Sequence, residues 1–247
     1  TQADVIEFAK AITGWSMPRY DADGADGWFM FRPQIHEPGA RKVLGKTYAE
    51  GGVEQGRAIM ADLAINPGTA KHLAYNLARH FVADQPPPAL VQRMAKRYLD
   101  SGGSLTALYT AMIRSDEVWS PDARKFRTPE DFLIASVRAT AAPTDGKGLK
   151  LTMMQTGMGQ PPFGSRSPAG FPDTANAWIG PDPILKRIQA ANMIAARTPR
   201  GSDPNAIASA ALGVRLRAAT AQAVHRAESP QQATAVLLAS PDFQWRI

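Results

Sequence analysis

The sequence predicts a mainly α-helical protein, an irregular multi-helix bundle with a small β-hairpin or extended loop and a long Pro/Gly-rich loop. Two observations support this prediction. Apolar residues recur at helical spacing, as in the run Leu105, Leu108, Tyr109, Met112 and Ile113. A capping residue followed by proline, which suits the free amides of a helix start, recurs at Asn66-Pro67, Thr128-Pro129, Asp182-Pro183, Asp203-Pro204, Ser229-Pro230 and Ser240-Pro241.

In chain order, the first predicted helix spans residues 2–13, places Phe8 and Ile12 on its apolar face, and ends before Gly14, a C-terminal glycine. Near the other end of the chain, Ser229 and Gln232 fit a capping box. Together, the caps and the periodicity predict further helices near 53–65, 67–83, 88–100, 104–114, 129–141, 147–157, 182–197, 204–212, 214–227 and 230–239.

Two regions depart from the helical pattern. Residues 28–32 and 42–48 are strand-like and are separated by prolines and glycine, which is consistent with either a small hairpin or an irregular loop. Residues 157–173 contain too much proline and glycine for a helix or a regular strand. Long loops of this kind are often functional or held in place by packing.

Composition narrows the possible functions. The 247 residues include no cysteine, which excludes disulfides, thiolate zinc sites, cysteine nucleophiles and iron–sulfur clusters. No run of about 18 apolar residues occurs, so we expect no membrane span.

The net charge of +6 comes entirely from residues 146–247, where the basic residues are dispersed. Dispersed charge favours a solvated surface, so nucleic acid is not an expected partner. We expect a single domain over residues 1–247.

His36 and Glu37 are the first candidate site residues. An imidazole beside a carboxylate can share general acid–base chemistry or bind a metal. However, adjacent side chains in an extended segment point in opposite directions. The alternative is structural: His36 bonds a nearby carbonyl group, and Pro38-Gly39 makes the turn.

The loop at residues 157–173 is the second candidate. It offers Gln160, Arg166 and Asp173, with Trp178 downstream. Aromatic faces combined with amide and carboxylate groups suit the recognition of carbohydrate or peptide. The alternative is a proline-rich strap whose two phenylalanines, Phe163 and Phe171, fill the core.

Other patterns do not support a site. His72 and His80 are eight residues apart on one predicted helix, too far around and along it to bind one metal. The segment Asp21–Gly27 resembles a calcium loop, but its carboxylates are out of register. No nucleophile elbow, phosphate-binding loop or dinucleotide fingerprint is present. We therefore expect no metal and no cofactor, and the sequence names no reaction.

Several strings in order resemble a known family: Thr13-Gly14-Trp15, His36-Glu37-Pro38-Gly39 with Val43-Leu44-Gly45, Ala78-Arg79-His80-Phe81-Val82 with Pro86-Pro87-Pro88, Lys125-Phe126-Arg127-Thr128-Pro129, Gly159-Gln160-Pro161-Pro162-Phe163-Gly164, and Ser167-Pro168-Ala169-Gly170-Phe171-Pro172-Asp173 with Trp178 downstream. This ordered set covers nearly the whole chain and resembles the bacterial domain-of-unknown-function 1800 family. Glu37 stands where aspartate is commoner in that family, and Phe171 where tryptophan is commoner.

The resemblance implies an exported bacterial protein that is periplasmic or secreted. Family members are usually about twice as long, so we expect this chain to be the C-terminal part of a longer protein. The missing N-terminal segment or a second exported protein is the expected partner. The resemblance carries no activity with it. Together with the lack of a catalytic motif, it favours a binding or assembly module for an envelope partner or polymer. The alternative is a hydrolase-type enzyme acting on an extracellular polymer, in which His36 and Asp173 meet in one cleft with Glu37.

Overall fold

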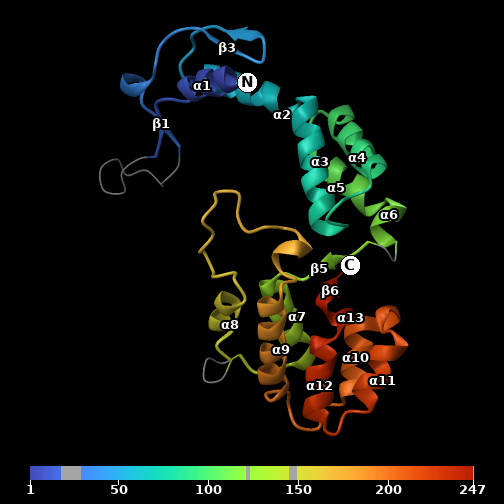
Figure 1. The fold of residues 1–247 in the computed structure, drawn as a ribbon. Helices are drawn as coiled ribbons and strands as arrows, with labels where there is room; N and C mark the ends of the chain where they lie inside the picture. The colour runs from blue at the N-terminus through green and yellow to red at the C-terminus, as the bar shows by residue number, and fades with distance from the viewer. Residues whose placement is uncertain (18–28, 121–122, 145–148, 247) are drawn as a thin grey trace. The chain divides into compact units, whose positions relative to one another are not determined.

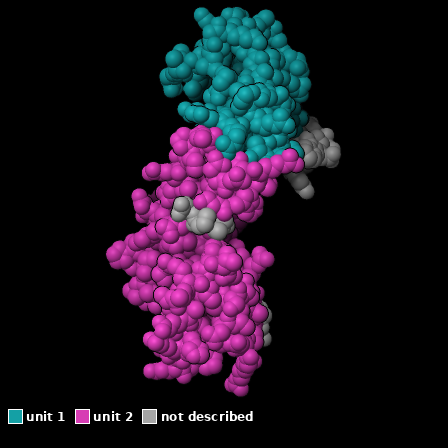
Figure 2. Space-filling view, turned by 90° about the vertical axis from the view of Figure 1, so that its right-hand side faces the viewer, with its two compact units in different colours: residues 1–74, 91–111 teal, residues 75–90, 112–247 magenta. Residues whose placement is uncertain are grey.

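A computed structural model describes residues 1–17, 29–120, 123–144 and 149–246. These ranges hold thirteen α-helices and three two-stranded sheets, which confirms the mainly α-helical prediction (Figure 1). The chain divides into two compact units, shown in different colours in Figure 2. Unit 1 comprises Thr1–Ala74 and Val91–Ala111, and unit 2 comprises Tyr75–Leu90 and Met112–Ile247. The single domain expected from the sequence stays a prediction.

Unit 1 is built around the first helix, which packs against a hairpin and the second helix (Figure 1). A small apolar core of Ala11, Val43, Tyr48 and Ile59 holds these elements together. Helices α3 (Pro67–Phe81), α4 (Pro88–Asp100) and α5 (Leu105–Ile113) are each divided between unit 1 and unit 2. The elements that lie wholly in unit 1 are α1 (Gln2–Ala11), β1 (Trp15–Ser16), β2 (Met30–Phe31), the 3₁₀ turn η1 (Pro33–Ile35), β3 (Arg41–Val43), β4 (Lys46–Tyr48) and α2 (Val53–Ala64).

Unit 1 contains a small hairpin, one of the two alternatives that the sequence left open, but its strands differ from those expected. The two strand-like segments do not pair with each other. Instead β2 pairs with β1, while β3 and β4 form a hairpin of their own. Leu44 and Gly45 connect β3 to β4 with φ angles of 48° and 82°. Two positive φ values match the tight hairpin turn that suits the twist of the flanking strands.

Unit 2 is a helical bundle in which α12 packs against α9, α10 and α11, and α9 packs against α7. Its core includes the buried side chains of Phe132, Ile194, Leu237, Leu238 and Phe243. The two-residue strands β5 and β6 pair with each other in an antiparallel arrangement. The elements that lie wholly in unit 2 are α6 (Asp116–Trp119), β5 (Lys125–Phe126), α7 (Pro129–Thr140), α8 (Leu151–Gly157), η2 (Ala175–Ala177), α9 (Pro181–Ala195), α10 (Pro204–Leu212), η3 (Gly213–Arg215), α11 (Ala218–His225), α12 (Pro230–Ala239), α13 (Pro241–Gln244) and β6 (Trp245–Arg246).

A buried arginine lies at the centre of unit 2. Arg187 on α9 is 1% exposed, and its guanidinium donates to the side-chain oxygen of Gln244 (3.0 Å) and to the carbonyl of Arg127 (2.7 Å). The rings of Phe126 and Phe132 flank it, with centroids 4.7 and 5.2 Å away. Burial lowers the pKa of Arg187 to about 10, so the group stays charged at neutral pH. It thereby joins α9 to the segment before α7 and to the C-terminal segment.

Most of the predicted caps are confirmed. The side chains of Asn66, Thr128, Asp203, Ser229 and Ser240 each accept a hydrogen bond from an amide two or three residues later. The predicted cap at Asp182 is wrong. Helix α9 begins at Pro181, one residue before the predicted start at 182, and its N-terminal cap is Gly180. Asp182 lies inside the helix and pairs with Lys186.

The predicted capping box at Ser229 is only half formed. Ser229 accepts from the backbone N–H of Gln232, but the Gln232 side chain accepts from the N–H of Glu228 instead of that of Ser229. Both bonds still occupy donors at the start of α12, because Glu228 directly precedes the cap.

Two predicted helix starts are too early. The helix expected at 147–157 begins at Leu151, and residues 147 and 148 lie outside the described residues. The helix expected at 214–227 begins at Ala218, because Gly213–Arg215 form a 3₁₀ turn and Leu216 is extended. The calcium-like segment Asp21–Gly27 also lies outside the described residues.

The close packing of α2 on the segment after α1 can be tested at Gly56. A methyl group there would lie 2.8 Å from the Trp15 ring and 3.1 Å from the carbonyl oxygen of Ala11. Alanine is the better helix former by about 1 kcal/mol, yet overpacking costs about 1–3 kcal/mol. We expect Gly56→Ala to lower the free energy of unfolding, measured by urea denaturation.

The matched control is Gly157→Ala. Gly157 is the last residue of α8, and nothing lies within 4 Å of the added methyl group. This variant is expected to be neutral or stabilised by up to about 1 kcal/mol. Equal effects of the two substitutions would contradict the contact between Gly56 and Trp15.

Candidate functional site

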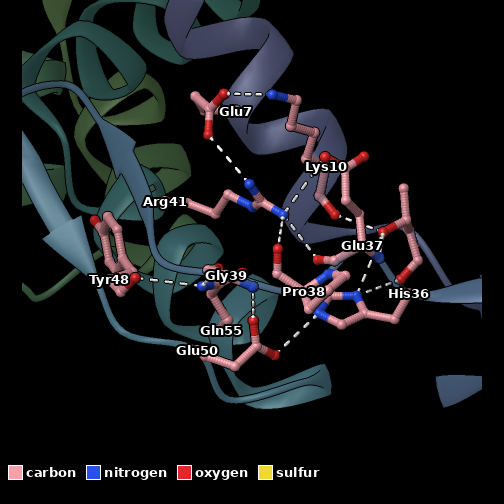
Figure 3. Close-up of polar contacts among 11 residues, drawn as sticks. Glu7, Lys10, His36, Glu37, Pro38, Gly39, Arg41, Tyr48, Glu50 and Gln55 are labelled. Carbon is pink, nitrogen blue, oxygen red and sulfur yellow. Dashed lines mark hydrogen bonds and ion pairs between the residues drawn. The ribbon is translucent and has the colours of Figure 1, made fainter.

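The loop after η1 in unit 1 is held by side chains rather than by regular secondary structure (Figure 3). The Arg41 guanidinium donates to the carbonyl oxygens of Glu37 and Pro38, both at 2.8 Å. Its other terminal nitrogen lies 3.6 Å from a carboxylate oxygen of Glu7 on α1. Arg41 is buried, so these bonds fix the loop against the core of unit 1.

Two further side chains fix the turn at Gly39. The buried Gln55 amide on α2 donates to the carbonyl oxygens of Gly39 (3.0 Å), Tyr48 (3.2 Å) and Ala49 (2.9 Å). The Glu50 carboxylate accepts from the backbone N–H of Gly39. One amide and one carboxylate therefore satisfy both backbone groups of Gly39, which has a φ of 112°.

The two ring nitrogens of His36 have different neighbours. Its Nδ1 lies 2.9 Å from the carbonyl oxygen of Thr13. A carbonyl can only accept, so Nδ1 carries the proton of this bond. The other nitrogen, Nε2, is buried without a hydrogen-bond partner and lies 3.5 Å from a Glu50 carboxylate oxygen. The structural interpretation of His36, a bond to a nearby carbonyl, is confirmed.

The carboxylate next to the His36 imidazole is that of Glu50, not that of Glu37. The Glu37 carboxylate lies 3.8 Å from Arg41 and is about half exposed. Hydrogen bonds from Gly39 and Gly52 hold the pKa of Glu50 below its usual value, so this carboxylate is ionised at neutral pH. Among the described residues, no three His, Asp or Glu side chains are placed to hold a metal ion.

In unit 2, Gln160 is a structural anchor for one end of the Pro/Gly-rich loop. Its side chain is buried, and its oxygen accepts from the backbone N–H of Glu130 (2.9 Å) in the first turn of α7. A helix start has free N–H groups that need such partners. Gln160 therefore ties the beginning of the loop to the start of a core helix.

The other end of the loop is held by a buried lysine. The Lys125 side chain is 2% exposed and pairs with Asp84. It also contacts Asp173 through the backbone carbonyl and, at 3.6 Å, through the carboxylate. Asp84 accepts in addition from the N–H of Ala175 (2.8 Å). The exposed His80 adds a weaker contact, 3.4 Å from the Asp173 carboxylate.

The aromatic residues of this region have separate roles. Trp178 is buried in a cluster with Phe126, and its indole N–H donates to the carbonyl of Pro172 (3.1 Å). Phe171 packs on the same cluster. Phe163 does not: its side chain is fully exposed. The strap interpretation is therefore right for Phe171 and wrong for Phe163. Arg166 is exposed on the loop between them.

The structure groups the predicted site residues by unit. His36 and Glu37 belong to unit 1, and Gln160, Arg166, Asp173 and Trp178 belong to unit 2. The sequence did not predict the partners that fix these residues, which are Arg41, Glu50, Gln55, Asp84 and Lys125. Lys125 and Phe126 are both buried in a two-residue strand, which is too short to give a recognisable sequence pattern.

A family model described as "Protein of unknown function (DUF1800)" matches residues 1–245. The chain belongs to the DUF1800 family. This confirms the resemblance seen in the ordered motifs, several of which form the two braced loops. No curated protein and no solved structure matches the chain. None of the helices in the described part of this DUF1800 chain has the length and apolar character needed to cross a bilayer.

The brace in unit 1 can be tested at Arg41. Arg41→Gln removes the donor of the Glu37 and Pro38 carbonyls and the ion pair to Glu7. We expect a loss of about 2 kcal/mol or more in the free energy of unfolding, because hydrogen bonds from a charged group contribute about 1.5–3 kcal/mol each. The exposed neighbour Lys42 gives the control: Lys42→Gln is expected to stay within about 0.5 kcal/mol. Similar losses would contradict the bracing role.

The brace in unit 2 can be tested at Lys125. Lys125→Met leaves two carboxylates without their shared cation, which is expected to cost about 3–5 kcal/mol. It should also speed proteolytic cleavage within residues 157–173, because the loop loses one of its anchors. Lys186→Met, which removes an exposed pair with Asp182, is expected to cost less than about 0.5 kcal/mol. Unchanged cleavage in Lys125→Met would show that the lysine does not anchor the loop.

Proposed function

We propose that this DUF1800 chain is a non-catalytic binding module of an exported protein, periplasmic or secreted, that recognises an envelope partner or polymer. The binding element is the turn at residues 161–164, here named the Phe163 turn. The observation that carries the proposal is the exposure and backbone strain of Phe163. Large aromatic side chains are frequent anchors of binding interfaces, because they bury much apolar area in a partner's pocket.

The Phe163 turn is tight. The N–H of Gly164 donates to the carbonyl of Pro161 (3.0 Å), which closes a four-residue turn. Phe163 has a φ of 56°, a conformation that costs a residue with a side chain about 1–2 kcal/mol. Glycine or asparagine normally occupies such a position. A strained, exposed aromatic residue supports a role outside the fold itself.

The loop that carries this turn is anchored on both sides. Gln160 lies directly before the turn and is bonded to α7, and Asp173 after it is held by Lys125. Anchoring limits the conformational entropy that the loop loses on binding, and so supports a preorganised binding element. Arg166 and the serines of the same loop would supply polar contacts around the ring.

The hydrolase alternative stays a prediction. His36 and Asp173 belong to different units, and each has its own local partners, Glu50 for His36 and Lys125 for Asp173. The His36–Glu50 pair places an imidazole nitrogen 3.5 Å from an ionised carboxylate, and Asp173 is not part of it. The binding proposal has the more specific support, because it explains a residue that weakens the fold.

The test replaces the aromatic ring without disturbing the turn. Phe163→Gly relieves the backbone strain, so the free energy of unfolding should be equal to wild type or higher by up to about 1 kcal/mol. Capture of a partner from a periplasmic extract, or sedimentation with purified cell-wall polymer, should fall at least about tenfold if an aromatic hot spot is lost.

Val214→Ala is the matched control, because Val214 is also a fully exposed apolar residue in unit 2. It should leave capture and sedimentation unchanged. A photocrosslinking residue at position 163 should give an adduct that position 214 does not. Wild-type capture by Phe163→Gly, or the same adducts from both positions, would overturn the proposal. Release of soluble fragments from the polymer would instead favour the hydrolase.

A further inference from the structure

A second feature of unit 2, separate from the Phe163 turn, is an open pocket of about 550 Å³ between α7 and α10. Ile134 on α7 and Ile207 on α10 line its walls together with small alanines, and Phe243 of α13 also lines it. Arg127, Asp131 and Arg138 supply its charges. Pockets of this size commonly hold small organic ligands.

The charges around this pocket are unbalanced. Among the described residues, Asp131 is the only carboxylate in the lining; it favours the charged form of Arg127, and Arg246 lies 3.2 Å from it. Arg127 and Arg138 have no ion pair with any residue that the structure describes. Arg215 lies close enough to Arg127 to disfavour its charged form. The pocket therefore combines two guanidinium groups that form no ion pair among the described residues with an apolar lining, and Asp131 offsets only part of their charge.

Arg127 is held in place without being neutralised. Its backbone N–H donates to the carbonyl of Gln244 (2.8 Å), and its carbonyl accepts from Arg187. Its guanidinium lies over the Phe243 ring, 4.9 Å from the centroid. The Nε atom is buried and has no hydrogen-bond partner among the described residues. Burial lowers the pKa of Arg127 to about 10, which still leaves it charged at neutral pH.

We propose that this pocket binds a small amphipathic carboxylate, with its anionic head between Arg127 and Arg138 and a short aliphatic body against Ile134, Ile207 and Phe243. Guanidinium groups bind carboxylates through paired hydrogen bonds. Asp131 in the same lining disfavours a second negative charge on the ligand, so a monoanion fits better than a phosphate dianion. The head and the body each match a different part of the lining.

Octanoate is the probe, measured by isothermal titration calorimetry on the full chain. We expect saturable binding of octanoate, and at least about tenfold weaker binding of octanol, acetate and inorganic phosphate, because each lacks either the monoanionic head or the aliphatic body. Equal binding of octanol would overturn the role of the arginines. Equal binding of acetate or phosphate would overturn the role of the apolar walls. Absence of saturable octanoate binding would overturn the site.

Two exposed positions allow variants that keep the fold. Arg138→Gln should weaken octanoate binding about tenfold, because a charge-assisted contact is lost. Ile134→Gln should reduce the preference for octanoate over acetate. The control Arg226→Gln removes the same charge from an exposed site in unit 2 that does not line the pocket, and should bind as wild type does. Equal losses in Arg138→Gln and Arg226→Gln would show only a general charge effect and overturn the proposal.

Discussion

The arrangement of unit 2 depends on the buried guanidinium of Arg187. Removing a charge from water costs several kcal/mol in a protein interior unless hydrogen bonds and neighbouring groups compensate it. Here the compensation comes from the Arg127 carbonyl, the Gln244 side chain and the rings of Phe126 and Phe132. These partners lie before α7, within α7 and near the C-terminus, so the charge is stable only when all three segments are in place. Arg187 therefore couples the helical bundle to the short β5–β6 pair.

Buried side chains also hold the two loops that carry family motifs, the loop after η1 and the Pro/Gly-rich loop. Neither the loop after η1 nor the Pro/Gly-rich loop has a regular ladder of backbone hydrogen bonds, so side chains must satisfy its polar groups. Arg41, Gln55 and Glu50 do this in unit 1, and Gln160 and Lys125 do it in unit 2. The residues that bear the family motifs are thus mostly the braced backbone and its anchors. This explains why several chemically attractive side chains have structural roles.

Two features are left over once those structural roles are assigned. Phe163 adopts a strained backbone conformation and contributes nothing to the core. Arg127 and Arg138 line a pocket and form no ion pair among the described residues. Phe163 weakens the free chain relative to glycine at the same position, and both features support the two binding proposals. The two features lie on different elements of unit 2, so binding at one does not presuppose binding at the other.

The sequence by itself determined most of the longer helices, because caps such as Thr128 and rows such as Leu105–Leu108–Met112 act within a few residues of each other. It also determined the membership of the DUF1800 family. The partners of the candidate residues were decided only by the tertiary structure. His36 meets Glu50, Asp173 meets Lys125, and β1 meets β2 through contacts between residues distant in the chain. Two-residue strands and single buried charges leave no periodic signal, because their stability comes from the surrounding fold rather than from local sequence.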